Sequence, residues 1–313
     1  MEGVRIQNYI SMARPAHWFK NILIIPGVII AARLTHTPPV EFVTPFVLGL
    51  LSACFISSAN YLMNEWVDAK FDQYHPLKKR RPAVAEDVSA IGVCSAYAGC
   101  AVFGLVLGAL VSRPFFFMAL LLLVMGYFYN IRPFRTKDRV YLDVLSESVN
   151  SPIRLVMGWY IVTTTAILPP ASFVIAYWMG GAFLMTMKRY AEYRFINDPD
   201  RAGLYRRSFC HYTEEKLLIV SFFYSLCTAL FLGVFLIKHR VELLVSFPFV
   251  AILFAWYLHI SMKAGSPAQT PESLHKEKSF LAYALFVALL MAGLLFLDLP
   301  WLHLFVEDTF GVQ

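Results

Sequence analysis

Long apolar runs alternate with short polar breaks along almost the whole chain. Nine runs are long enough to cross a hydrocarbon core of about 30 Å as helices. They lie at approximately 19–34, 41–63, 89–111, 113–131, 141–165, 169–188, 215–237, 241–262 and 279–297. Stretches such as FFFMALLLLVMGYFY have no polar face, which a soluble helical bundle would need. The pattern therefore predicts an all-α integral membrane protein with nine transmembrane helices.

The composition agrees with this pattern. Of the 313 residues, 58% are hydrophobic and only 15% are charged, and the mean hydropathy is +0.58. These values are far from those of a soluble globular domain. We expect no cleavable signal peptide, because residues 1–20 are polar and lack a short apolar core. No soluble domain is evident, so residues 1–313 are predicted to form a single transmembrane domain.

The distribution of positive charge predicts the orientation. Most of the 27 lysine and arginine residues fall in the N-terminal tail and in breaks around 64–88, 132–140, 188–216 and 263–278. The positive-inside rule therefore places the N-terminus in the cytoplasm and the C-terminus on the opposite side. All the long charged breaks then share the cytoplasmic side, where we expect the chemistry. The net charge of +6 is explained by anionic lipid and requires no nucleic acid.

The first large polar break, NEWVDAKFDQYHPLKKRRP, begins at Asn64. If the second apolar helix continues into it, Asn64, Asp68 and Asp72 lie at i, i+4 and i+8 on one face. Amide and carboxylate oxygens suit Mg²⁺, which takes its other ligands from water and substrate phosphates. Two carboxylates at this spacing repel each other unless a cation lies nearby. The break therefore predicts a magnesium site.

A basic run, Lys78 to Arg81, follows these acidic residues directly. Acidic residues for a metal and basic residues for phosphate are the makeup of a site for a diphosphate or a phosphate ester. A basic run by itself is also typical of any cytoplasmic loop, so this alternative stays open. Glu65, Glu86 and Asp87 lie off the shared face or beyond the run, and we expect them to be solvated.

Two further cytoplasmic breaks repeat the combination of acid and base. The segment YNIRPFRTKDRVYLDVLSESVNSPIR places several bases and Asp138 before Asp143 and Glu147, which are four residues apart. Arg154 lies two helical turns beyond Glu147, so a structural ladder of ion pairs would also explain these charges. The third break contributes Lys188, Arg189 and Glu192, and its outer part, 197–207, is expected to be an ordinary solvated loop.

These motifs together resemble the UbiA superfamily of intramembrane prenyltransferases. The resemblance rests on NEWVDAKFD with the following HPLKKRRP, on LDVLSE after RTKDR, and on a layout of nine spans with long breaks after the second, fourth and sixth. It implies a nine-helix bundle whose lipid-facing cavity opens to the cytoplasmic side. In this cavity two acidic motifs hold Mg²⁺ against the phosphates of a polyisoprenoid substrate.

The resemblance also assigns roles to individual residues. The implied metal ligands are Asn64, Asp68, Asp72, Asp143 and Glu147, the implied phosphate contacts include Lys78 and Arg81, and the expected catalytic residues are Asp68, Asp72, Asp143 and Lys188. The expected mechanism is metal-assisted ionisation of a diphosphate, with apolar helices excluding water from the cationic centre. Glu147 stands where the family has Asp, and Asp138 competes for that role, so the second metal site stays open.

One branch is more similar than the others. The segments ARPAHWFKN and KRYAE look like the polyprenyl-phosphate phosphoribosyltransferases, such as those acting on decaprenyl phosphate. These enzymes transfer 5-phosphoribosyl from phosphoribosyl diphosphate to a lipid phosphate in the bacterial inner membrane. Their two phosphorylated substrates would require additional charged groups, for which the candidates are Lys20, Lys137, Arg154, Lys188, Arg189 and Glu192.

Two other functions stay open at this point. In most of the superfamily a polyprenyl diphosphate is the donor, and its prenyl group is transferred to an aromatic or other acceptor; the acidic motifs alone do not distinguish the two reactions. A transporter of lipid phosphates would have a similar basic mouth, but transporters often have inverted repeats and charges near the midplane. This sequence has no clear repeat, and its charges gather at one face. The sequence does not predict the length of the isoprenoid, the identity of the acceptor or the oligomeric state.

Overall fold

The computed structural model describes residues 2–86, 88–165, 167–269 and 271–305, and the regular elements in these ranges are all helical. Its contacts divide the chain into two compact units. The first unit comprises Met1–Pro169 and Ile196–Leu217, and the second comprises Pro170–Phe195 and Leu218–Gln313. The segment after α9 therefore belongs to the first unit, although α9 itself lies almost wholly in the second.

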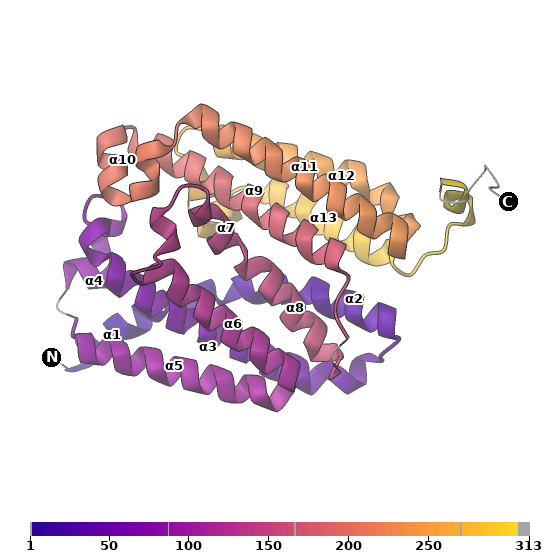
Figure 1. The fold of residues 1–313 in the computed structure, drawn as a ribbon, viewed down its shortest axis with the longest axis horizontal. Helices are drawn as coiled ribbons and strands as arrows, with labels where there is room; N and C mark the ends of the chain where they lie inside the picture. Colours follow the sequence, from indigo (N-terminus) through magenta and orange to yellow (C-terminus); the bar gives the residue numbers. More distant parts are fainter. Residues whose placement is uncertain (1, 87, 166, 270, 306–313) are drawn as a thin grey trace. The chain divides into compact units, whose positions relative to one another are not determined.

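The first unit is built around one long helix, α3 (Pro39–Asp72). This helix packs against α5 (Ala90–Val111), α6 (Arg113–Asn130) and α8 (Asn150–Val162), as Figure 1 shows. Its other elements are α1 (Glu2–Ala13), η1 (Pro15–Ile24), α2 (Ile25–Thr35), η2 (Lys78–Arg80), α4 (Pro82–Ala85), η3 (Thr136–Asp138), α7 (Leu142–Ser148), α10 (Pro199–Tyr205) and η4 (Arg207–His211). The short elements and the loops beside them connect the long helices and carry many of the charged residues of this unit.

Glycines permit a close helix contact in this unit, between α8 and the segment formed by η1 and α2. A Cβ atom at Gly27 would lie 1.9 Å from the carbonyl oxygen of Leu155, and one at Gly158 would lie 2.0 Å from that of Ile24. Because backbone atoms cannot move aside as flexible side chains do, only glycine fits at these two positions. Small residues of this kind let helices approach closely in membranes, where lipid supplies no hydrophobic drive for helix association.

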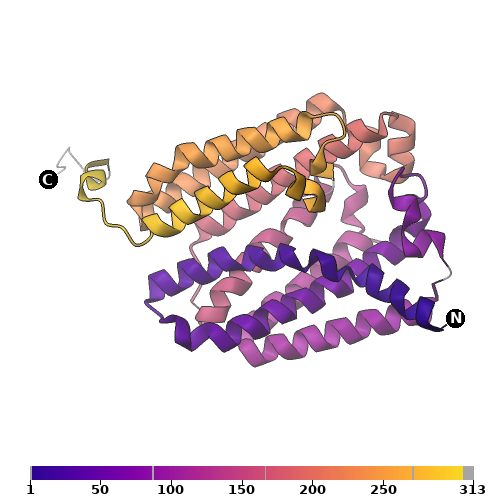
Figure 2. The same cartoon turned by 180° about the vertical axis from the view of Figure 1, so that it is seen from behind.

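The second unit contains α9 (Ala171–Ile196), α11 (Glu214–His239), η5 (Val241–Ser246), α12 (Phe247–Met262), η6 (Pro267–Gln269), η7 (Pro271–Lys276), α13 (Lys278–Leu294) and η8 (Pro300–Phe305). Helices α12 and α13 pack together and are coloured orange and yellow in Figure 2. An apolar groove of about 300 Å³ is lined by residues of α9, α11 and α12, among them Phe183, Leu232 and Phe254.

Six helical segments in the described ranges are long and apolar enough to cross a membrane. They are Ile6–Thr35, Pro39–Asp72, Ala90–Val111, Arg113–Asn130, Glu214–His239 and Val241–Met262. The other three predicted runs correspond to the pair α7 and α8, to the charged helix α9, and to α13 with its 17 residues. The condition on which the first acidic motif depends is met, because the second apolar helix continues without a break as far as Asp72.

Candidate active site

The last turns of α3 carry the first acidic motif. Because the helix continues to Asp72, Asn64, Asp68 and Asp72 share one face. Asp68 is largely buried and Asp72 is almost completely buried. Each carboxylate has one oxygen paired with a cation: Oδ1 of Asp68 lies 2.9 Å from Nη2 of Arg135, and Oδ2 of Asp72 lies 2.6 Å from Nη1 of Arg81.

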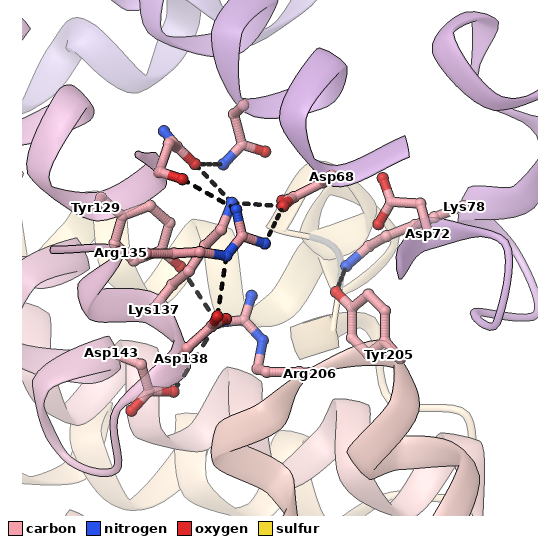
Figure 3. A network of polar contacts seen from close by, with 12 residues as sticks. Asp68, Asp72, Lys78, Tyr129, Arg135, Lys137, Asp138, Asp143, Tyr205 and Arg206 are labelled. Carbon is pink, nitrogen blue, oxygen red and sulfur yellow. Dashed lines mark hydrogen bonds and ion pairs between the residues drawn. The ribbon is translucent and has the colours of Figure 1, made fainter. Parts of the chain in front are cut away.

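Two cations reach Asp68 from the loop between α6 and α7. Besides Arg135, the ammonium of Lys137 lies 2.5 Å from Oδ1 of Asp68, and it also donates to Oδ1 of Asn130 at 2.6 Å. The guanidinium of Arg135 donates to Asp138 at 3.0 Å and to the carbonyl of Asn130 at 2.9 Å. These contacts fix both cations against the end of α3, as Figure 3 shows.

The backbone of this loop is strained beside the charges that it carries. Arg135 has φ +31° and Tyr141 has φ +65°, which is a backbone conformation that residues other than glycine rarely adopt. Such strain persists only where surrounding contacts impose it. For Arg135 those contacts include Asp68, Asp138 and the ring of Phe71, whose centroid lies 4.7 Å from the guanidinium carbon.

The electrostatics of the loop favour an anion. Lys137 is 3% exposed. Burial lowers the pKa of its ammonium, repulsion from Arg135 and Arg206 lowers it further, and Asp68 partly opposes both, so that the pKa falls from 10.5 to about 8. The ammonium of Lys137 is therefore still protonated at pH 7, although it is buried close to the guanidinium groups of Arg135 and Arg206. A bound phosphate group would relieve this repulsion.

The basic run after α3 meets the 198–212 segment, which contains α10 and η4. Lys78 hydrogen-bonds the hydroxyl of Tyr205 and lies over its ring. The ring of His75 packs edge-on against the same tyrosine, and Nε of Arg201 donates to the carbonyl of Tyr74 at 2.9 Å. The prediction that 197–207 is an ordinary solvated loop is confirmed for 197–201, which are exposed, but it was wrong for Ala202 and Tyr205, which are buried.

The second acidic motif has different partners from the first. Asp143 is fully buried, and its two oxygens accept hydrogen bonds from the hydroxyls of Tyr212 at 2.7 Å and Ser208 at 3.0 Å. Arg206 lies 3.9 Å from the same carboxylate. Glu147 accepts from the hydroxyl of Tyr129 at 2.8 Å. The competing residue, Asp138, is bound to Arg135.

The other predicted site residues lie apart from this cluster or in the second unit. Arg154 is buried in the first unit, where its guanidinium donates to Asn21, Ser57 and the carbonyl of Asn150. Lys20 lies 3.3 Å from the ring of His17. Lys188, Arg189 and Glu192 belong to α9 in the second unit, where Arg189 and Glu192 form a buried ion pair at 3.3 Å.

The acidic residues that we expected to be solvated have three different outcomes. Glu65 is 2% exposed and pairs with Arg14 at 2.5 Å, so that prediction was wrong. The burial of Glu65 depends on α1 and Arg14, which pack against α3 and which an isolated helix does not reveal. Glu86 is exposed and accepts a hydrogen bond from Asn8. Asp87 lies outside the described residues.

Sequence reasoning missed several residues that the fold brings to this cluster: Asn130, Arg135, Tyr205, Arg206, Ser208 and Tyr212. Arg135 stands in a break with other arginines, and nothing in the spacing separates it from them. The aromatic and basic residues around YRRSF were a weak signal, because such residues are equally common in interfacial loops.

The first motif fits a magnesium ion. Asn64 donates its amide to Asn130 at 2.7 Å, which leaves its Oδ1 as an acceptor. Among the described residues, Oδ2 of Asp68 and Oδ1 of Asp72 form no hydrogen bond or ion pair. Three hard oxygens, one per turn, suit an ion that keeps several waters and binds substrate phosphates. No group of three or more His, Cys, Asp or Glu side chains that could enclose a metal was found in the part of the chain that the structure describes.

Known proteins share both sequence and fold with this chain. The model of the UbiA prenyltransferase family matches residues 22–274. The nodulation protein NoeC of Azorhizobium caulinodans is 24% identical over 220 residues, which are 66% of this chain and 64% of that protein. A decaprenyl-phosphate phosphoribosyltransferase of Mycolicibacterium smegmatis is 26% identical over 225 residues, 69% of this chain and 65% of that protein. The matched part thus spans less than two thirds of either relative's length.

Solved structures show the same fold. A UbiA homologue from Archaeoglobus fulgidus bound to GPP and Mg²⁺ has a TM-score of 0.67 at 21% identity, covering 90% of this chain and 99% of that one. The homologue from Aeropyrum pernix K1 has a TM-score of 0.62 at 15% identity, covering 85% and 97%. The expected similarity to the phosphoribosyltransferases is confirmed by the relatives that match. The described residues contain six helical segments long and apolar enough to cross a membrane, and the cluster from Asn64 to Tyr212 lies inside the matched region. The chain is therefore an integral membrane protein that belongs to the UbiA prenyltransferase family.

Proposed function

We propose that this protein is a magnesium-dependent transferase that moves a 5-phosphoribosyl group from phosphoribosyl diphosphate to a polyprenyl phosphate. The observation that supports it most is the cluster of five cations, Lys78, Arg81, Arg135, Lys137 and Arg206, around the first acidic motif. A reaction between two phosphorylated substrates brings more negative charge to a site than does one diphosphate with a neutral acceptor. The similarity to decaprenyl-phosphate phosphoribosyltransferases points in the same direction.

The contacts of each residue indicate which part of the substrates it would bind. Asn64, Asp68 and Asp72 would hold Mg²⁺ through the oxygens that no cation occupies. When bound, the ion stabilises the negative charge that develops on a departing diphosphate. Lys78 and Arg81 would contact the oxygens of that diphosphate, since both lie beside Asp72 on the basic run.

Lys137 and Arg206 would bind the phosphate groups of the substrates that Lys78 and Arg81 do not contact. In Figure 3 the end of the Lys137 side chain lies on the other side of Asp68 from Lys78, and Arg206 lies below Asp68. Because they are already fixed by Asn130 and Tyr129, little side-chain entropy is lost when an anion binds.

The placement of the protein in the membrane forms part of the proposal. We propose that the single domain, 1–313, crosses the inner membrane of a bacterium nine times, with the N-terminus in the cytoplasm. A lipid-facing cavity then opens on the cytoplasmic side, where the isoprenoid chain lies against apolar helices that exclude water. Lys20, Arg154, Lys188, Arg189 and Glu192 are also proposed to bind the substrates, and Lys188 stays a candidate catalytic residue.

An assay of purified protein in detergent with Mg²⁺ tests the reaction directly. One arm contains polyprenyl phosphate and labelled phosphoribosyl diphosphate, and the other contains polyprenyl diphosphate and a panel of aromatic acceptors. Asp68→Asn and Asp72→Asn are compared with Glu41→Gln, which removes an exposed carboxylate from the first turn of the same helix.

We expect a labelled phosphoribosyl lipid in the first arm, lost on chelation of Mg²⁺ and in both aspartate variants but retained in Glu41→Gln. Product in the second arm alone would assign the protein to prenyl transfer and contradict the proposed donor. Product that persists in both aspartate variants would contradict the proposed metal site.

A further inference from the structure

The 198–212 segment connects the two loops that carry the cations of the site. Tyr205 of this segment contacts Lys78 in the loop after α3, and Arg201 binds the backbone of the same loop at Tyr74. On the other side, Nη1 of Arg206 lies 3.3 Å from the hydroxyl of Tyr129, at the end of α6. The segment therefore brings a tyrosine and an arginine from a distant part of the sequence to the anion site.

The segment is also attached, by two hydrogen bonds, to Asp143. Its carboxylate is 0% exposed, and an ionised carboxylate is costly to bury unless strong donors surround it. Both of its oxygens accept from hydroxyls of the segment, those of Tyr212 and Ser208. The Tyr212 hydroxyl in turn accepts from the backbone amide of Tyr141 at 2.8 Å, so that one tyrosine is held at two points beside α7.

These partners distinguish Asp143 from the carboxylates of the first motif. Asp68 and Asp72 each have one oxygen that makes no hydrogen bond or ion pair among the described residues, whereas both oxygens of Asp143 are engaged by the segment. A metal bound to Asp143 would require a rearrangement of a fully buried place in which two hydroxyls already donate to the carboxylate. An anchoring role requires no such rearrangement.

We propose that Asp143 is a positioning residue: its buried carboxylate anchors the 198–212 segment, and this anchor holds Arg206 where it binds substrate phosphate. This inference rests on the proposed function, because it assigns to Arg206 an anion that the same site binds. Asp143 then acts through Arg206 and touches neither Mg²⁺ nor substrate. Figure 3 shows the Arg206 guanidinium between Asp143 and the cluster around Asp68.

The experiment compares three ways of removing the anchor in the full-length protein in detergent. Asp143→Asn changes the acceptor, while Ser208→Ala and Tyr212→Phe each remove a single hydroxyl and leave the carboxylate in place. Glu242→Gln is the matched control, because it neutralises a buried acid that is 2% exposed and pairs with Arg240 in the second unit. Arg206→Gln removes the cation that the anchor is proposed to hold.

Two measurements are made on each variant. The first is the rate of tryptic cleavage after Arg206 and Arg207, which requires no activity. The second is the binding of magnesium pyrophosphate by calorimetry, together with the Mg²⁺ concentration that gives half-maximal binding.

We expect all three anchor variants to be cleaved several-fold faster at these sites, while Glu242→Gln is cleaved at the wild-type rate. The dissociation constant of magnesium pyrophosphate should rise about tenfold in these variants and in Arg206→Gln, as expected for loss of one charge-assisted contact. Combining Asp143→Asn with Arg206→Gln should weaken binding no further, because both changes remove the same contact. The Mg²⁺ requirement should stay unchanged.

An increased Mg²⁺ requirement in Asp143→Asn with unchanged cleavage would overturn the proposal and make Asp143 a metal ligand. Faster cleavage in Glu242→Gln as well would also overturn it, because the effect would then be general unfolding. If the wild-type protein does not bind magnesium pyrophosphate, the proposed function fails. The cleavage rates then still decide whether Asp143 anchors the segment.

Discussion

Replacing Asp68 by Asn should destabilise the protein, and an added anion should restore the stability. The substitution removes the carboxylate that faces Arg135 at 2.9 Å and Lys137 at 2.5 Å, and both cations are almost completely buried. Removing one partner of a buried ion pair costs about 3–5 kcal/mol. Arg135 keeps its ion pair with Asp138, and Lys137 keeps its hydrogen bond to Asn130, so we expect a loss at or just below the lower end of that range, about 2–3 kcal/mol.

Thermal unfolding in detergent at pH 7, without Mg²⁺, measures this loss. For a chain of 313 residues, a change of this size corresponds to a decrease in Tm of about 3–5 °C. Inorganic pyrophosphate should then raise the Tm of Asp68→Asn more than that of the wild type, because the anion replaces the missing carboxylate between the cations. At a concentration of 100 times Kd, binding contributes about 2.7 kcal/mol, which matches the loss.

Glu242→Gln again provides the control, since it removes a buried carboxylate from the ion pair with Arg240 in the second unit. Pyrophosphate should not restore its stability. An unchanged Tm in Asp68→Asn would show that the pairing with Arg135 and Lys137 contributes little to stability. Equal effects of pyrophosphate on both variants would refute the reasoning that these cations form an anion site.

Three further predictions concern other parts of the first unit. Arg81→Gln should raise KM for the phosphorylated donor about 10-fold to 100-fold with a smaller change in kcat, because it removes a charged contact beside Asp72. Steady-state kinetics measure this change, and Arg80→Gln, at an exposed position, should behave like wild type. Asp72→Asn should increase the Mg²⁺ concentration needed for half-maximal pyrophosphate binding at least tenfold, since one hard ligand oxygen loses its charge; calorimetry at several Mg²⁺ concentrations measures it, and an unchanged requirement would remove Asp72 from the metal site. Gly158→Ala should lower the Tm by several degrees, because its Cβ would meet the Ile24 carbonyl at 2.0 Å, whereas Gly99→Ala, which meets nothing within 4 Å, should not; equal Tm values for both would contradict the close contact.

The helices could be predicted from the sequence because they depend on local properties. Apolar runs of sufficient length specify helices in lipid, where each backbone amide must find its partner within the same segment. The continuation of α3 to Asp72 follows from the same local logic, and with it the shared face of Asn64, Asp68 and Asp72. Their spacing alone indicated hard oxygen ligands, and the basic run beside them indicated phosphate.

The partners of those residues depended on the tertiary structure. Arg135 is 67 positions from Asp68 in the sequence, and Tyr212 is 69 positions from Asp143. No local pattern selects Arg135 from the other arginines of its break, or shows that 198–212 packs against the site. The sequence therefore determined the membrane class, the helices and the acidic face, because these arise within one segment. The tertiary structure decided which cation meets which carboxylate, because that depends on how distant loops pack.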